Sequence, residues 1–243
     1  MKNIFTFALI LLTLSVVTAQ NNFEQDIIKT KSGELKITFI GHGTLMFEYD
    51  NLVIHIDPVG RYADYSKLQK ADLILITHQH GDHLDPAAIG QILKEETKIF
   101  CNLASLEKAP GAEVLKNGDK TEYKGISIET VPAYNLVHKR DNGHPFHPKG
   151  EGNGYVLTIG GKKIYIAGDT ENVPEMKDLE NIDIAFLPMN LPYTMTPQMV
   201  ADAVKMFNPK ILYPYHYGNT NVSELDDLLK GNKECEIRIR KLN

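Results

Sequence analysis

The chain has 243 residues, of which 42% are hydrophobic and 23% charged, and its formal net charge is −5. This length allows one domain with a substantial core, and the composition is that of an ordinary globular protein, which excludes a disordered chain. A mildly acidic chain with no cluster of lysine and arginine is not expected to bind nucleic acid.

The first 19 residues differ from the rest of the chain. Lys2 precedes an apolar run from Ile4 to Val17, and small residues follow as far as Ala19. This pattern is typical of a secretory signal peptide, and the run is shorter than the roughly 20 residues that a membrane span needs. We therefore expect residues 1–19 to direct export to the periplasm or the extracellular space, with no stable membrane anchor.

Residues 20–34 are polar and are expected to form a loose lead-in to one domain over residues 35–243. Hydrophobic patterning predicts strands at 35–40, 45–49, 52–56, 73–77, 98–101, 126–131, 155–159, 163–167, 184–187, 211–213 and 236–240. It predicts helices at 86–96, 174–179, 197–207 and 223–230, with caps at Thr196 and Ser223. Early hairpins followed by alternating strands and helices indicate a layered α/β protein with helices outside the sheets.

The only cysteines, Cys101 and Cys235, both lie in strand-like segments. Export would permit a disulfide between them, but two separate buried thiols fit the sequence equally well. Neither has the spacing of a metal site.

A dense group of metal-binding residue types follows the predicted strand at 73–77. It reads His78-Gln79-His80-Gly81-Asp82-His83. Three imidazoles and a carboxylate are costly to bury unless something organises them. His78 and His80 lie two positions apart and can hold one ion, and after Gly81 the next pair can face a second. Imidazole and carboxylate ligands suit zinc, and also manganese or iron.

With this run the chain resembles the metallo-β-lactamase superfamily, over most of residues 35–243. Four further segments come in that family's order: Gly41-His42-Gly43-Thr44, Asp57-Pro58, Ala167-Gly168-Asp169-Thr170 and Pro214-Tyr215-His216-Tyr217-Gly218. The chain looks most like the stand-alone metal-dependent hydrolases, a group similar to ascorbate-phosphate lactonase. The resemblance implies a four-layer αββα sandwich with two divalent metal ions, zinc before manganese or iron.

The resemblance also implies that Asp169 bridges both ions and that His216 completes the second. The third protein ligand of the first ion stays open. Many superfamily members carry a histidine just after the strand predicted at 126–131, and this chain has none there. We favour His147, and the other candidates are His138, His144 and Asn135.

Residues around the ligands are expected to support them or to hold the substrate. His42 and Asp57 follow neighbouring strands and could orient the ligand histidines. The candidates to bind a polar or anionic part of the substrate are Lys149, Arg140 and Tyr193.

These residues predict a hydrolase in which an ionised water attacks the substrate, with Asp82 acting both as a ligand and as the catalytic group that orients the water. The expected substrate is a small molecule with an ester, lactone, amide or phosphodiester bond. Two other functions remain open, a non-enzymatic metal-binding protein on the same fold and an exported β-lactamase. The sequence does not set the oligomeric state.

Overall fold

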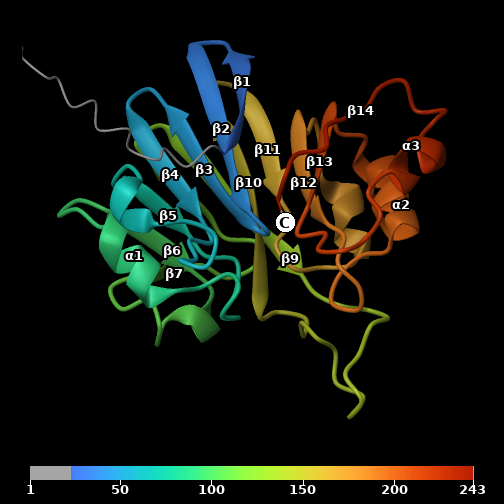
Figure 1. Ribbon diagram of the computed structural model, residues 1–243, viewed down its shortest axis with the longest axis horizontal. Coiled ribbons are helices and arrows are strands. Elements are labelled where there is room, and N and C mark those ends of the chain that lie inside the picture. The colour runs from blue at the N-terminus through green and yellow to red at the C-terminus, as the bar shows by residue number, and fades with distance from the viewer. Residues whose placement is uncertain (1–22, 243) are drawn as a thin grey trace, which may run out of the picture.

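The computed structural model describes residues 23–242, so the predicted signal peptide at 1–19 lies outside the described residues. Two seven-stranded sheets face each other, and helices lie on the outer side of each sheet (Figure 1). The predicted αββα sandwich is therefore confirmed. No helix among the described residues is both long enough and apolar enough to cross a membrane.

The first sheet contains β1 (Glu24–Thr30), β2 (Gly33–Gly41), β3 (Thr44–Tyr49), β4 (Leu52–Ile56), β5 (Leu73–Leu75), β6 (Lys98–Cys101) and β7 (Glu113–Val114). The second contains β8 (Lys120–Tyr123), β9 (Ile126–Ala133), β10 (Gly152–Ile159), β11 (Lys162–Ile166), β12 (Ile184–Pro188), β13 (Ile211–Tyr215) and β14 (Glu236–Ile237). The helices are α1 (Pro86–Ile92), α2 (Pro197–Phe207) and α3 (Glu224–Leu228), with 3-10 helices η1 (Tyr65–Lys67), η2 (Leu103–Ser105) and η3 (Pro174–Asp178).

The two sheets have matching topologies. In the first, β1 to β4 pair antiparallel and β4 to β7 pair parallel. In the second, β8 to β11 pair antiparallel and β11 to β14 pair parallel. Short turns join most of the antiparallel pairs, and the longer segment 134–151 joins β9 to β10. Asp50 and Asn51, both with positive φ, connect β3 to β4. Helices or longer loops join the parallel strands.

The main core lies between the sheets. Phe39 and Phe47 of the first sheet pack against Tyr213 and Phe186 of the second, with ring centroids 5.0 Å and 5.9 Å apart. All four side chains are almost completely buried. Each such aromatic removes a large apolar area from water, so this layer is what holds the sheets together.

The outer faces are covered by the helices. Ile89 and Ile92 of α1 pack on the first sheet in a second apolar cluster. Val204 of α2 belongs to the main core, on the outer side of the second sheet (Figure 1). The α2 helix begins as predicted, because Thr196 Oγ1 accepts a hydrogen bond from the Met199 amide at 3.0 Å.

Several sequence predictions are wrong in detail. Residues 24–30 form the edge strand β1 where a loose lead-in was expected, and the pattern missed it because only Ile28 is buried there. The short, mostly exposed strands β7 and β8 were missed for the same reason. The first helix ends at Ile92 rather than at 96. Ser223 makes no side-chain capping bond to α3. Of the two arrangements that the sequence left open for Cys101 and Cys235, the structure has two separate buried thiols.

Strands β2, β4, β5, β9, β11 and β13 end at the same edge of the sandwich, and a polar segment follows each of them. His42 follows β2, and its carbonyl accepts a hydrogen bond from the amide of His216, which follows β13, at 3.0 Å. Asp57 follows β4, and its amide donates to Leu75 at the end of β5 at 3.0 Å. The ends of β9 and β11 supply the remaining segments. Residues far apart in the sequence therefore meet at this edge.

Candidate metal centre

The run from His78 to His83 folds back on itself directly after β5. The amides of His83 and Leu84 both donate to the His80 carbonyl, at 3.1 Å and 2.9 Å. This turn leaves His78 and His80 side by side, with His78 Nε2 3.1 Å from His80 Nδ1. Asp82 and His83 lie together in another group, with His42 and His216.

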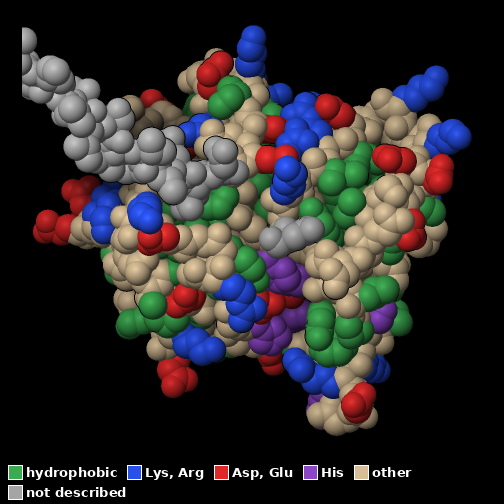
Figure 2. Space-filling view, in the orientation of Figure 1, with side chains coloured by type: hydrophobic (Ala, Val, Ile, Leu, Met, Phe, Trp, Pro, Cys, Tyr) green, Lys and Arg blue, Asp and Glu red, His purple; other side chains and the backbone are tan. Residues whose placement is uncertain are grey.

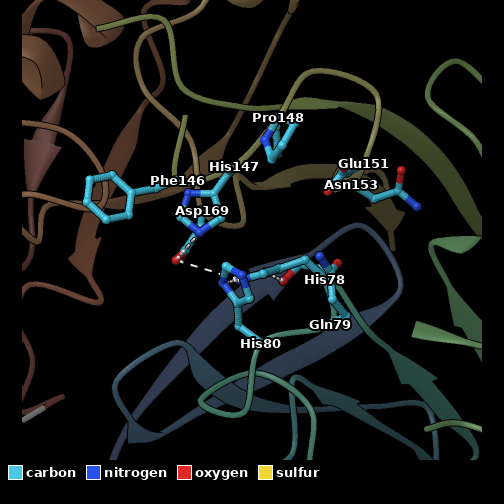
Figure 3. A pocket seen from close by; sticks show the side chains of 12 residues that line it. His78, Gln79, His80, Phe146, His147, Pro148, Glu151, Asn153 and Asp169 are labelled. Carbon is cyan, nitrogen blue, oxygen red and sulfur yellow. Dashed lines mark hydrogen bonds and ion pairs between the residues drawn. The ribbon is translucent and has the colours of Figure 1, made fainter. Parts of the chain in front are cut away.

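The first group of potential ligands consists of His78, His80 and His147, whose ligand atoms all lie within 4.8 Å of one another. His147 comes from the loop after β9, and its Nε2 lies 3.3 Å from Asp169 Oδ2. Figure 3 shows His147 and Asp169 facing His78 and His80 from the opposite side. One carboxylate oxygen of Asp169 therefore lies next to this group.

The second group consists of His42, Asp82, His83 and His216. Asp82 Oδ2 lies 3.2 Å from His42 Nε2 and 3.7 Å from His216 Nε2. The sequence assigned His42 only a supporting role. In the structure His42 is also a candidate ligand, because a ring nitrogen of His42 lies within 4.8 Å of the ligand atoms of the other three residues.

Asp169 lies between the two groups. Its Oδ1 is 3.3 Å from His83 Nε2, and its Oδ2 is 3.4 Å from His216 Nε2, 3.3 Å from His147 Nε2 and 3.8 Å from His78 Nε2. One buried carboxylate therefore contacts imidazoles of both groups. The bridging position implied by the family resemblance is compatible with this geometry.

The donor set fits divalent cations. Ligands about 2.1 Å from a tetrahedral ion lie roughly 3.4 Å from one another, which is close to the separations measured here. Among the described residues, Asp169 Oδ1, His83 Nε2 and His216 Nε2 are buried without a hydrogen-bond partner. Buried polar atoms normally have partners, so these orphaned atoms point to an ion that they would share.

The electrostatics of the site also favour bound cations. Burial alone would raise the pKa of Asp169, but His216 and His83 outweigh it and hold this pKa well below its usual range. For His83 the burial effect lowers the pKa, yet Asp169 and Asp57 dominate and raise it well above the ordinary value. Ionised carboxylates that draw positive charge into a buried cluster are what a metal site requires.

Three of the site residues have strained backbones. His42, Asp57 and His216 have φ of 54°, 45° and 45°, in the left-handed region that side chains other than glycine rarely adopt. Each follows directly after a strand. Such strain is retained mainly at functional sites, where the surrounding structure compensates for it.

Asp57, which the sequence suggested as a support for the ligand histidines, contacts His83. Its Oδ2 lies 2.7 Å from His83 Nδ1, and both side chains are fully buried. Thr77 donates to the same carboxylate from its amide at 2.7 Å and from its hydroxyl at 2.6 Å. With Nδ1 occupied in this way, His83 Nε2 is left facing Asp169. The sequence did not single out Thr77.

A second support involves Asn135 and Glu171. Asn135 Oδ1 accepts hydrogen bonds from the His147 amide at 2.9 Å and from His147 Nδ1 at 2.7 Å. Asn135 Nδ2 donates to Glu171 Oε1 at 3.1 Å. Burial would raise the pKa of Glu171, but backbone amides led by those of His138 and Val137 lower it. Sequence reasoning missed Glu171, although it lies two residues after Asp169.

The other candidates for the third ligand lie elsewhere. His138 Nδ1 is 2.7 Å from Glu171 Oε1, and neither His138 nor the exposed His144 belongs to a ligand group among the described residues. The Asn135 side chain accepts from His147 and donates to Glu171 and to the Tyr193 carbonyl, so its polar atoms are already engaged. Of the four candidates, the structure brings His147 into the cluster.

An open cavity of about 300 Å³ lies above the ligand groups. Arg140, Phe146, Asn190 and Tyr193 contribute to its walls, and Asp82 and Asp169 to its floor. Lys149, the third substrate-binding candidate, does not line this cavity and pairs with Glu175 at 2.7 Å. Phe146 and Asn190 were not singled out from the sequence, because nothing in a loop sequence shows which side chains face a cavity.

Comparison with known proteins identifies relatives along most of the chain. Residues 36–216 match the model of the β-lactamase superfamily domain. A protein of Pelotomaculum thermopropionicum named UPF0173 metal-dependent hydrolase is 33% identical over 203 residues, which cover 79% of this chain and 88% of that protein. One of the same name from Thermococcus onnurineus is 34% identical over 195 residues, or 75% and 84% of the two chains.

Solved structures agree with the sequence relatives. The crystal structure of a protein from Parabacteroides distasonis described as a metal-dependent hydrolase matches with a TM-score of 0.87 at 56% identity, over 91% of this chain and all of that one. The metallo-β-lactamase fold protein YhfI from Bacillus subtilis, only 15% identical, shares the fold with a TM-score of 0.65 over 86% of this chain and 97% of its own. The chain therefore belongs to the metallo-β-lactamase superfamily, among its stand-alone metal-dependent hydrolases.

Proposed function

We propose that this protein hydrolyses an ester, lactone, amide or phosphodiester bond of a small molecule at a centre of two divalent ions, zinc before manganese or iron. The observation that carries the proposal is the position of Asp169. This buried carboxylate contacts imidazoles of both ligand groups beneath an open cavity.

Each ion has its own protein ligands in this proposal. His78, His80 and His147 would hold the first, and Asp82, His83 and His216 would hold the second, with Asp169 between them and His42 as a further candidate. When bound, such ions lower the pKa of a coordinated water to about 7 and neutralise negative charge that develops on the substrate.

The surrounding residues would orient the water and the substrate. Asp82 lines the cavity, and the neighbouring imidazoles of His216 and His42 outweigh the effect of burial and keep its pKa well below the usual range. An ionised Asp82 can accept a hydrogen bond from the attacking water and so direct it toward the cavity. Arg140 and Tyr193 stand on the cavity wall, where a guanidinium and a phenol could hold an anionic or polar part of the substrate.

We also propose that the protein is exported after removal of residues 1–19. The apolar run after Lys2 and the small residues before Gln20 support this. N-terminal sequencing of protein recovered outside the cytoplasm should begin at Gln20. A start at Met1 in the soluble cytoplasmic fraction would contradict the export proposal and leave the hydrolase proposal intact.

Metal content and hydrolysis test the main proposal together. The purified protein should retain close to two ions per chain after dialysis against zinc, measured by inductively coupled plasma mass spectrometry. The zinc-loaded protein should hydrolyse p-nitrophenyl acetate, bis(p-nitrophenyl) phosphate, dihydrocoumarin or an anilide. Asp82→Ala should abolish turnover, whereas Asp202→Ala on the exposed side of α2 should not.

Each alternative function predicts a different outcome. Protein that holds zinc tightly but hydrolyses none of these substrates would support the metal-binding alternative and overturn the proposal. Turnover of a β-lactam alone would support the β-lactamase alternative. A protein that retains no zinc, manganese or iron would contradict all three.

A further inference from the structure

Large apolar side chains are exposed at the edge of the cavity. Nine large hydrophobic side chains among residues 23–242 are exposed, and four of them lie on the two segments that also supply Phe146 and Asn190 to the cavity wall. These are Leu136 and Val137 after β9, 47% and 65% exposed, and Leu191 and Tyr193 after β12, 44% and 45% exposed. We name these four residues the apolar rim. Apolar patches beside a pocket mark sites of ligand or partner contact.

The apolar rim is held in its exposed position by buried polar groups. Glu171 Oε2 accepts hydrogen bonds from the amides of Leu136 and Val137, both at 2.7 Å. Glu171 itself is fully buried. The backbone under these side chains is therefore fixed, and their exposure does not result from a loose loop.

The two segments of the rim are joined to each other. Asn135 Nδ2 donates a hydrogen bond to the Tyr193 carbonyl at 2.9 Å. The amides of Tyr193 and Thr194 donate to the Asn190 carbonyl at 2.9 Å and 2.8 Å, which closes a tight turn around Leu191. Hydrogen bonds therefore hold together the two segments that carry the apolar rim.

The rim is continuous with the cavity wall. The ring of Tyr193 packs edge to face against the ring of Phe146, with centroids 5.1 Å apart, and both residues line the cavity. Figure 2 shows hydrophobic side chains on the surface directly beside the histidines of the site. Tyr193 therefore belongs both to the cavity wall and to the apolar rim.

We infer that the substrate carries an apolar acyl, alkyl or aryl group next to the cleaved bond, and that Phe146 and the apolar rim bind this group. The inference rests on the proposed hydrolytic function. The cavity of about 300 Å³ is small for a ligand site, so a longer substrate has to extend over its edge. At this edge it meets apolar side chains, which disfavour a sugar or a nucleotide and favour a hydrocarbon group.

A series of esters that differ only in acyl length tests this inference. For the zinc-loaded protein, kcat/KM is measured with p-nitrophenyl acetate, butyrate, hexanoate and octanoate below their micelle concentrations. Each buried methylene is worth up to about 0.8 kcal/mol, so kcat/KM should rise by about two- to fourfold per methylene. The double substitution Val137→Ser with Leu191→Ser should flatten this rise. Leu103→Ser is the matched control, because Leu103 is 69% exposed in η2 and does not line the cavity.

A binding measurement separates failure of this inference from failure of the proposed function. Butyrate, hexanoate and octanoate are titrated into the same protein by calorimetry, which requires no turnover. Affinity that grows with chain length in the parent, and not in the double variant, supports the rim as the binding surface even if no ester is cleaved. Affinity or kcat/KM that is independent of chain length overturns the inference, even if every ester is cleaved.

The apolar rim could instead contact a second copy of the chain or a lipid surface, and each of these gives a different experimental result. If the rim joins two copies of the chain, sedimentation velocity should show a dimer that the double variant disperses. If it meets a lipid surface, phosphatidylcholine–phosphatidylglycerol vesicles should sediment the parent and not the variant. Either result, without a chain-length effect on binding or turnover, would overturn the assignment to substrate.

Discussion

The side-chain oxygen of Asn135 accepts two hydrogen bonds from His147, one from the amide and one from Nδ1, at 2.9 Å and 2.7 Å. The amide of Asn135 has a defined orientation, since its Nδ2 donates to the Glu171 carboxylate and to the Tyr193 carbonyl. An amide oxygen only accepts, so the proton of the imidazole has to sit on Nδ1. His147 Nε2 is then the free donor atom, and it is the atom that faces Asp169.

Substitution of Asn135 should therefore weaken the first metal position. Asn135→Ala removes both bonds to His147, and loss of a residue that orients a ligand typically lowers metal affinity by about 10- to 100-fold. Competition with a chromophoric chelator measures this affinity without any substrate. Asn142→Ala is the control on the same loop, because its side chain contacts only the exposed His144 amide. Equal zinc affinity of Asn135→Ala and parent would contradict the role assigned to Asn135.

Gly43 should be essential because of the space it leaves for His83. A Cβ at this position would lie 2.8 Å from His83 Cε1, closer than real Cβ contacts permit. His83 is fully buried and cannot move aside without breaking its bond to Asp57. Gly43→Ala should lose about one ion per chain and lower hydrolysis by at least about tenfold. In Gly90→Ala the added Cβ meets nothing within 4 Å, so that variant should keep the metal content and the hydrolysis rate of the parent.

The candidate ligands that could be predicted from the sequence are those fixed by local spacing or by the order of motifs. The run from His78 to His83 follows a buried strand, and that alone indicates a metal site. Asp169 and His216 are recognisable because they follow strands in the family's order. That His42 lies among the candidate ligands could not be predicted. Its position depends on the left-handed backbone after β2 and on the hydrogen bond between its carbonyl and the amide of His216 after β13.

The parts of the fold that the sequence did not predict are those with little buried apolar surface. β1 has one buried residue, Ile28, so its alternation of polar and apolar residues is too weak to recognise. What holds β1 in place is polar: Asp26 accepts hydrogen bonds from Arg240 Nη2 at 2.8 Å and 2.9 Å. Arg240 is 214 residues away in the chain. No local pattern reveals a partner at that distance.

This ion pair should make the stability of the protein sensitive to acid. Burial alone would raise the pKa of Asp26, but hydrogen bonds from Tyr213 and Arg240 outweigh it and lower this pKa below 3.8. Because the pKa is lowered by folding, the ionised carboxylate of Asp26 stabilises the fold at pH values above its unfolded-state pKa. This stabilisation is lost as the pH falls through the folded-state pKa. Asp26→Asn should reduce the free energy of unfolding at pH 7 by about 1–2 kcal/mol, measured with urea.

The difference in free energy of unfolding between Asp26→Asn and the parent should shrink as the pH is lowered from 5 to 3, because the parent then loses the same charge. Asp202→Asn, which removes an exposed carboxylate paired within α2, should change neither the stability at pH 7 nor its loss in acid by more than about 0.5 kcal/mol. A constant difference between Asp26→Asn and the parent across this range would show that Asp26 is not the group that titrates.

The two cationic candidates for substrate binding should behave differently. The Arg140 guanidinium lies 5.1 Å from the centre of the Phe146 ring and lines the cavity, whereas Lys149 is engaged with Glu175 outside it. Mono-p-nitrophenyl succinate and p-nitrophenyl butyrate are matched esters that differ in one carboxylate. A hydrogen bond between charged groups contributes about 1.5 kcal/mol at an exposed site, so Arg140→Ala should lower kcat/KM for the succinate about tenfold relative to the butyrate.

Lys149→Ala should leave that ratio unchanged, and Arg140→Lys should restore part of it, because a lysine keeps the charge but not the planar pair of donors. Added salt should reduce the preference for the succinate in the parent, since an exposed charge is screened by ions. If Lys149→Ala lowered the ratio as much as Arg140→Ala, the anion would be attracted by the general positive field of the loop. Contact with one guanidinium on the cavity wall would then not explain the preference.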